Sequence, residues 1–202
     1  MPEPPANQAM PRQESGQRPA RPAPYALQVT GDEDRVGGAV RLTFTNSGAA
    51  AAVFQVRSAV VGVAPRTYTV GARQQISDLW KVTGGVYDLS VHGPNGFLHS
   101  FAGDFASPTV SAAYDAKQGS IRLDFLSSVD IPHRLHITSA YTGKTISHVL
   151  DPDEFYTLTE DLEESFGWYD FTIESETLPK FRRRLAGHVE TGRDSMTDPA
   201  IG

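Results

Sequence analysis

Hydrophobic and polar residues alternate in short runs along most of the chain. Tyr87, Leu89 and Val91 share one parity and enclose the polar Asp88 and Ser90. A period of two residues places one side of the backbone in a core and the other in solvent, which indicates a half-buried β-strand. Further runs of strand length lie at 25–29, 40–44, 53–57, 66–70, 97–101, 121–125, 134–138, 146–150, 155–158, 169–173 and 181–185.

Turn-forming residues separate these runs, and no window of helical period stands out. In the segment 93–96, Pro94 fixes its own φ, while Asn95 and Gly96 tolerate positive φ, so the segment is predicted to be a hairpin turn. Comparable clusters lie at 31–34, 46–48, 83–85 and 142–144. Short strands with such regular punctuation predict an all-β sandwich or barrel.

An internal repeat divides the chain, because three segments recur in the same order at nearly one spacing. The pairs are 41–44 with 122–125, 86–91 with 168–173, and 97–103 with 181–187, at offsets of 81, 82 and 84 residues. We therefore predict two tandem immunoglobulin-like β-sandwich domains of about 80 residues, at 25–106 and 107–190, with room for seven strands in each. Packing of the two units against each other would add to the stability of such small domains.

Both ends of the chain differ from this pattern. Residues 1–24 hold seven prolines and no large hydrophobic residue beyond methionine. Such a segment cannot bury enough apolar surface to offset its ordering entropy, so it is predicted to be a flexible linker. The polar residues 191–202 are predicted to be a second flexible tail.

Composition excludes several classes of function. The 18 basic and 24 acidic residues give a net charge of −6, which argues against nucleic-acid binding by bulk electrostatics. The absence of cysteine excludes disulfides, cysteine zinc sites, iron–sulfur clusters and thiol nucleophiles. No apolar stretch is long enough to span a membrane. The N-terminal residues have no basic segment followed by a hydrophobic block, so we expect no signal peptide in the chain as given.

No motif for catalysis is found in the sequence. There is no nucleophile elbow, no phosphate-binding loop and no dinucleotide fingerprint. His133 and His136 are three residues apart, which places them on opposite faces of a strand, so we expect no metal site and no other cofactor. Tyr87 and Asp88 also face opposite sides, and we interpret this dipeptide as a core tyrosine beside a solvent-facing aspartate rather than as a catalytic dyad.

Two segments are candidates for binding. The first is the turn that carries Asn95, with His92 and Phe97 on either side, because loops at the ends of sandwiches often carry recognition.

The second candidate is the basic run Arg182, Arg183 and Arg184 in an otherwise acidic chain. On a strand, Arg182 and Arg184 share one face and Arg183 has the other. One interpretation is a solvated edge strand that is protected by charge. The other is contact with a partner domain or a lipid phosphate, since guanidinium groups suit carboxylates and phosphates alike.

Several segments strongly resemble the C-terminal region of bacterial phosphocholine-preferring phospholipases C, and the resemblance covers essentially the whole chain. They are Pro24–Leu27, Tyr87–Phe97, Phe181–Arg193 and Asp198–Ala200, together with the tail residues Met10–Glu14. In that family, a large N-terminal domain of alkaline-phosphatase-like fold hydrolyses phosphatidylcholine or sphingomyelin to release phosphocholine. Two tandem copies of a small β domain follow it.

The resemblance is to the two small domains only, so the catalytic nucleophile and the metal ligands of the family have no positions here. It implies a non-catalytic module of a secreted or periplasmic enzyme, whose partners are the catalytic domain and a phospholipid membrane surface. Two alternatives remain open at this stage. One is an autonomous tandem sandwich for adhesion or carbohydrate binding, and the other is an enzyme in its own right.

Overall fold

A computed structural model describes residues 16–127 and 130–200, and these residues form strands and connections without a helix. Accordingly, no described helix is long and apolar enough to cross a membrane. In chain order the strands are β1 (Pro19–Ala20), β2 (Leu27–Asp34), β3 (Ala39–Asn46), β4 (Ala52–Ser58), β5 (Arg66–Val70), β6 (Gln74–Lys81), β7 (Val86–His92), β8 (Leu98–Asp104), β9 (Thr109–Asp115), β10 (Ser120–Leu126), β11 (His133–Ser139), β12 (Thr145–Leu150), β13 (Phe155–Asp161), β14 (Trp168–Ser175), β15 (Arg182–His188) and β16 (Ser195–Met196).

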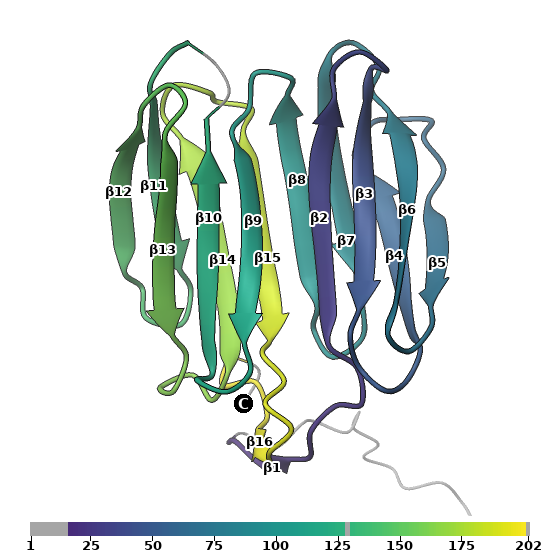
Figure 1. Cartoon of the computed structure of the whole chain (residues 1–202), viewed down its shortest axis with the longest axis vertical. Helices are drawn as coiled ribbons and strands as arrows, with labels where there is room; N and C mark the ends of the chain where they lie inside the picture. The colour runs from purple at the N-terminus through teal and green to yellow at the C-terminus, as the bar shows by residue number, and fades with distance from the viewer. Residues whose placement is uncertain (1–15, 128–129, 201–202) are drawn as a thin grey trace, which may run out of the picture.

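The fold is all-β, as predicted, and consists of two layers (Figure 1). In the described chain, one layer is an eight-stranded antiparallel sheet of order β12-β11-β14-β15-β8-β7-β4-β5. The other layer consists of two three-stranded sheets, β2-β3-β6 and β13-β10-β9. Strands β2–β8 therefore make one sandwich and β9–β15 the next. In each, the fourth strand pairs with the third, whereas in constant-type immunoglobulin domains it pairs with the fifth.

Each sandwich has its own hydrophobic core, which the period-two residues build. In the first, Leu42, Phe44 and Trp80 are almost completely buried between the two layers. In the second, Leu123 and Phe125 occupy the corresponding place. The interpretation of the Tyr-Asp dipeptides is also confirmed, because the tyrosines at 87 and 169 are buried while the aspartates that follow them are only partly so.

The two sandwiches are joined by their last strands, because β8 and β15 pair directly. We call this junction and the side chains that flank it the seam. Ser100 faces Arg184 across the seam. These two residues are counterparts in the sequence repeat, at its offset of 84 residues. A pseudo-twofold axis therefore passes between them, and each sandwich presents the same edge to the other.

The pairing of β15 on both sides corrects one expectation from the sequence. The basic run of residues 182–184 was consistent with a charged, solvated edge strand. Instead β15 lies between β14 and β8, so both of its backbone edges are hydrogen bonded. The predicted alternation of its side chains is confirmed, since Arg182 and Arg184 are exposed while Arg183 is 3% exposed.

Arg183 crosses the seam into the first sandwich. Its Nη2 donates a 2.6 Å hydrogen bond to the hydroxyl of Tyr87, and its Nη1 donates to the carbonyl oxygen of Ala102. The Tyr87 hydroxyl in turn donates a 2.7 Å hydrogen bond to Glu33 Oε1. The guanidinium also lies 4.8 Å from the ring centroid of Phe181, within cation–π range. These contacts satisfy a charge that burial would otherwise make costly.

The pseudo-symmetric position on the other side of the seam is occupied by His99, which is completely buried. Its Nδ1 lies 3.0 Å from the carbonyl oxygen of Val29, so this nitrogen carries the proton and donates it. Its Nε2 lies 3.4 Å from the hydroxyl of Tyr114 and 3.5 Å from that of Tyr169. Tyr169 is the counterpart of Tyr87 in the repeat, so one tyrosine per sandwich receives a side chain from the other sandwich.

Parts of the two predicted tails are paired rather than flexible. Residues 19–20 form β1 and pair with β16 in the C-terminal segment. The carbonyl oxygen of Pro24 accepts hydrogen bonds from Ala49 N and Ala50 N, which fixes the N-terminal segment to the first sandwich. The sequence did not indicate this because each segment is too polar to fold alone, and only their mutual pairing orders them. Residues 1–15 and 201–202 lie outside the described residues.

Candidate functional site

Both ends of the described chain lie at the same end of the sandwiches, which we call the terminal end (Figure 1). It is formed by the segments 16–26 and 189–200 and by the connections 47–51, 71–73, 93–97, 116–119, 140–144 and 162–167. We call the opposite end the distal end, and its described connections include 35–38, 59–65, 82–85, 151–154 and 176–181. Any protein segment that precedes the described residues joins the module at the terminal end.

The predicted hairpin turn lies at the terminal end, between β7 and β8. Asn95 and Gly96 have φ values of 54° and 71°, and Gly93 N donates to the carbonyl oxygen of Phe97 at 2.9 Å. The predicted binding residues of this turn differ in exposure. His92 and Asn95 are exposed, whereas Phe97 is 5% exposed and stacks on the His99 ring with 4.4 Å between centroids.

Trp168 and His188 form the centre of the terminal end. Trp168 Nε1 donates a 2.9 Å hydrogen bond to the carbonyl oxygen of Met196, and its ring centroid lies 4.8 Å from that of His188. His188 Nδ1 lies 3.0 Å from Glu190 Oε1, and the other carboxylate oxygen of Glu190 accepts a 2.9 Å hydrogen bond from Ala23 N. Glu190 thereby links the C-terminal segment to the N-terminal one.

A recess of about 450 Å³ opens between these groups and the hairpin turn. Its walls include Tyr25, Asn95, Trp168 and Met196. The pKa of Tyr25 is raised, first because the phenol is partly buried and second because the charge of Glu190 is near. The recess thus combines apolar walls with several polar groups, among them Asn95, His188 and Glu190, which is the composition of a binding site.

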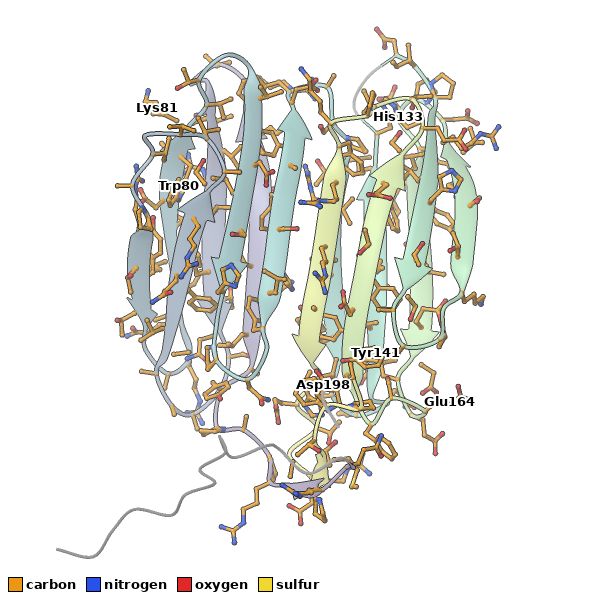
Figure 2. The ribbon with its side chains drawn as sticks, turned by 180° about the vertical axis from the view of Figure 1, so that it is seen from behind. Trp80, Lys81, His133, Tyr141, Glu164 and Asp198 are labelled. Carbon is orange, nitrogen blue, oxygen red and sulfur yellow. The ribbon has the colours of Figure 1, made fainter. Side chains whose placement is uncertain are left out.

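A second recess of about 630 Å³ shares Trp168 and continues along the terminal end. The Tyr141 hydroxyl, in its wall, donates a 2.8 Å hydrogen bond to Asp198 Oδ1 (Figure 2). Burial first, and then this hydrogen bond, raise the pKa of Tyr141. Four carboxylates also line this recess, from Glu160, Asp161, Glu163 and Glu164, together with the ammonium of Lys144. The terminal end is therefore acidic over this recess.

The basic run lies away from the terminal-end recesses. Arg182 and Arg184 project from the outer face of the eight-stranded sheet, where Arg184 forms a bidentate pair with Asp170 at 2.9 and 2.7 Å. Arg183 points inward. The expectation that Arg183 and Phe97 contact an external partner is therefore corrected, since burial leaves both side chains facing the interior.

Sequence reasoning missed most of the terminal end. Trp168 is 7% exposed, and its hydrogen bond to the C-terminal segment had no local signal in the sequence. One sign was available in the repeat, where Val86 in the first unit is replaced by Trp168 in the second. An aromatic residue with a hydrogen-bond donor that occurs in just one of the two copies indicates an acceptor that the other copy lacks.

The described residues contain no group of three or more His, Asp or Glu side chains that could hold a metal ion.

A model of the family described as "Bacterial phospholipase C, C-terminal domain" matches residues 19–104 and again 108–188. The chain belongs to this family. The two matches coincide with the two sandwiches, so each sandwich is one copy of the phospholipase C C-terminal domain.

Whole proteins that carry this domain are similar along the full chain. The non-hemolytic phospholipase C of Burkholderia pseudomallei is 42% identical over 100% of this chain, and that of Pseudomonas aeruginosa is 37% identical over 100% of it. The hemolytic phospholipase C of Pseudomonas aeruginosa is 34% identical over 96% of the chain. The chain spans about 30% of the length of these phospholipases C.

Solved structures add nothing to this assignment. A red sea bream transglutaminase covers 83% of the chain at 11% identity with a TM-score of 0.30, the chain covering 31% of it. A bacterial ice-binding adhesin covers 88% at 11% identity with a TM-score of 0.23, the chain covering 65% of it. Scores this low carry no argument about the phospholipase C C-terminal domain.

Proposed function

We propose that this chain is the non-catalytic C-terminal module of a phospholipase C that is secreted or periplasmic. The catalytic region of that enzyme hydrolyses phosphatidylcholine or sphingomyelin to phosphocholine. The module has two immunoglobulin-like units, 25–106 and 107–190, and residues 1–24 link it to the catalytic region. It packs on the catalytic region through the terminal end and fixes the orientation of that region relative to the module.

The observation that carries this proposal is the recess beside the point where residues 16–26 join the body. The tether brings the catalytic region to this end, so its effective concentration is highest there. Tyr25, Trp168 and Met196 line the recess with apolar surface, and Asn95 and Glu190 add polar groups. Protein interfaces combine apolar and polar surface in this way.

The test is a binding measurement between the chain and the separately expressed catalytic region of its parent enzyme, by isothermal titration calorimetry. We expect saturable binding, and we expect the exposed-site variant Asn95→Arg to weaken it at least tenfold by placing a bulky cation in the recess. Arg182→Ala, on the outer sheet face, is the matched control and should bind normally. Normal binding by Asn95→Arg together with weak binding by Arg182→Ala would place the contact on the sheet face instead.

The absence of catalysis is tested separately. The purified chain, incubated with phosphatidylcholine or sphingomyelin, should release no phosphocholine. Release that survives repeated purification would show an enzyme in its own right. Lack of any association with the catalytic region, combined with binding to glycans, would favour the adhesion alternative.

A further inference from the structure

Exposed hydrophobic side chains gather at the distal end. Ten large hydrophobic residues are exposed in the described chain, and Phe166 is the one that lies in a terminal-end connection. Six lie in or directly beside distal-end connections, namely Val36, Val60, Val61, Leu126, Ile131 and Phe155. Single exposed hydrophobic residues are ordinary, but the placement of six out of ten makes the distal end the more apolar of the two ends.

Two of these residues are completely exposed. Val36 is 103% exposed in the β2–β3 turn, and Val61 is 98% exposed in the β4–β5 connection. Glycines follow both, and Gly62 has a φ of 86°. Turn tips favour glycine, asparagine, aspartate and serine, while a β-branched residue gains nothing there from backbone geometry or packing. Neither valine is explained by the fold of this chain.

The second sandwich presents a comparable apolar group. Phe155 begins β13 and is 64% exposed, and Leu126 ends β10 and is 42% exposed. The two are direct cross-strand partners. Directly opposed residues have Cβ atoms about 5 Å apart, so these side chains form one apolar group on the distal end of the second unit.

The charges at the distal end are mixed. Lys81, which Figure 2 shows at this end, and Lys180 are exposed. The β12–β13 connection contributes the exposed acidic residues Asp151 and Asp153. A surface of this kind has no net basic field, so it does not favour anionic lipids. It is compatible with a zwitterionic surface, where contact depends on apolar insertion rather than on charge.

We propose that the distal end is a membrane-contact surface, in which Val36, Val61 and Phe155 insert into the interface of a zwitterionic phospholipid bilayer. Protein partners require a contiguous, complementary patch. These side chains instead project from separate connections, and a fluid bilayer accommodates separate apolar tips. The described chain begins and ends at the terminal end, so a catalytic region that is attached through the N-terminal segment joins the module away from the distal end. The inference goes beyond the proposed function and rests on it only for the choice of a lipid surface.

Membrane contact at both sandwiches would orient the strands along the membrane normal. Strands of seven or eight residues span about 25 Å, so the terminal end would stand about that far from the interface. The remainder of the related phospholipases C is more than twice the size of this chain. A catalytic region of that size, packed on the terminal end, is large enough to reach back along the sandwich to the lipid.

The test uses the whole chain and vesicles of pure phosphatidylcholine in a cosedimentation assay. We expect the wild-type chain to sediment with the vesicles equally at low and high salt. The double variant Val36→Asp/Val61→Asp should bind at least tenfold more weakly. Phe166→Asp, at the terminal end, is the matched control and should bind as wild type does. Both valines are fully exposed, so circular dichroism of the double variant should be unchanged.

A second measurement reports insertion directly. Val61→Trp places a fluorophore at the tip, and its emission should shift to the blue and be quenched by lipids brominated in the acyl chain. Absence of wild-type sedimentation, equal binding by the double Asp variant, or a requirement for anionic lipid would each overturn the proposal. So would self-association that the double Asp variant abolishes, because the occupant would then be a second copy. These results do not depend on binding to the catalytic region, so the two proposals can fail separately.

Discussion

Arg183 donates a 2.6 Å hydrogen bond to the hydroxyl of Tyr87, a residue that lies 96 positions earlier in the chain and belongs to the other sandwich. The guanidinium is thereby buried in the core of a unit that it does not belong to. Because His99 makes the reciprocal contact with Tyr169, both sandwiches depend on a side chain that the other supplies.

Removal of Arg183 should be strongly destabilising. Arg183→Ala leaves Tyr87 and Glu33 without their buried cation and creates a cavity, so we expect the free energy of unfolding to fall by about 3–5 kcal/mol. Arg184→Ala removes an exposed pair with Asp170 and should cost less than about 1 kcal/mol. Urea unfolding monitored by tryptophan fluorescence compares the two. Equal effects at 183 and 184 would contradict the assignment of Arg183 to the seam.

The seam should weaken in acid because of His99. Burial lowers the pKa of His99 to about 4, while the unfolded chain binds this proton below about pH 6.5. Between these pH values the unfolded state therefore binds more protons than the folded state. Neutral His99 thus contributes about 3 kcal/mol to the free energy of unfolding above about pH 6.5, and this contribution is lost as the pH falls to about 4. The facing phenols of Tyr114 and Tyr169 have raised pKa values and remain neutral throughout.

The measurement is the urea midpoint at several pH values between 7 and 4. The His99→Gln variant should show a flatter dependence than the wild type, because glutamine does not titrate. His136→Gln, on the sheet surface, is the control and should retain the steeper dependence of the wild type. The same steep dependence in His99→Gln would show that other groups cause the loss.

The two sandwiches should unfold as one unit. The eight-stranded sheet is continuous through β8 and β15, so neither sandwich can lose its last strand without exposing the seam of the other. We expect a single calorimetric transition whose measured enthalpy equals its van't Hoff enthalpy. Two resolved transitions would mean that the seam contributes little to stability.

The terminal segments should depend on Trp168. Trp168→Phe keeps an aromatic ring but loses the indole donor to Met196 O, so β1 and β16 should open more often. Trypsin should then cleave faster after Arg193, and mass spectrometry of the products measures this. Trp80→Phe, in the first sandwich, should leave the rate of this cleavage unchanged.

Alternation along the chain was sufficient to predict most strands and the sandwich class. Besides β1 and β16 in the predicted tails, two strands of the sandwiches were missed for identifiable reasons. In β6, Leu79 lies on the outer face and is 38% exposed, while Asp78 has the inward parity of Trp80, so the period-two signal is lost. In β9, the inward residue at the centre is Ala112, which is too small to mark a buried face. Both strands became evident only from their pairing partners.

The seam and the terminal end could not be predicted from local sequence patterns. The alternation of the arginines at 182–184 is the same for an edge strand and for a central strand, so the sequence could not distinguish them. The distinction depends on β8, which approaches from about 80 residues away. The order of the terminal segments likewise depends on Trp168 and Glu190, which meet residues at the opposite end of the chain.

The position of Ser100 opposite Arg184 makes the junction resemble an interface between two copies of one unit. In a symmetric homodimer, a residue on the axis faces its own copy, and every other contact occurs twice. Here the two copies belong to one polypeptide, so symmetry does not require equal residues at matching positions. Histidine at 99 and arginine at 183 therefore occupy equivalent places with different chemistry.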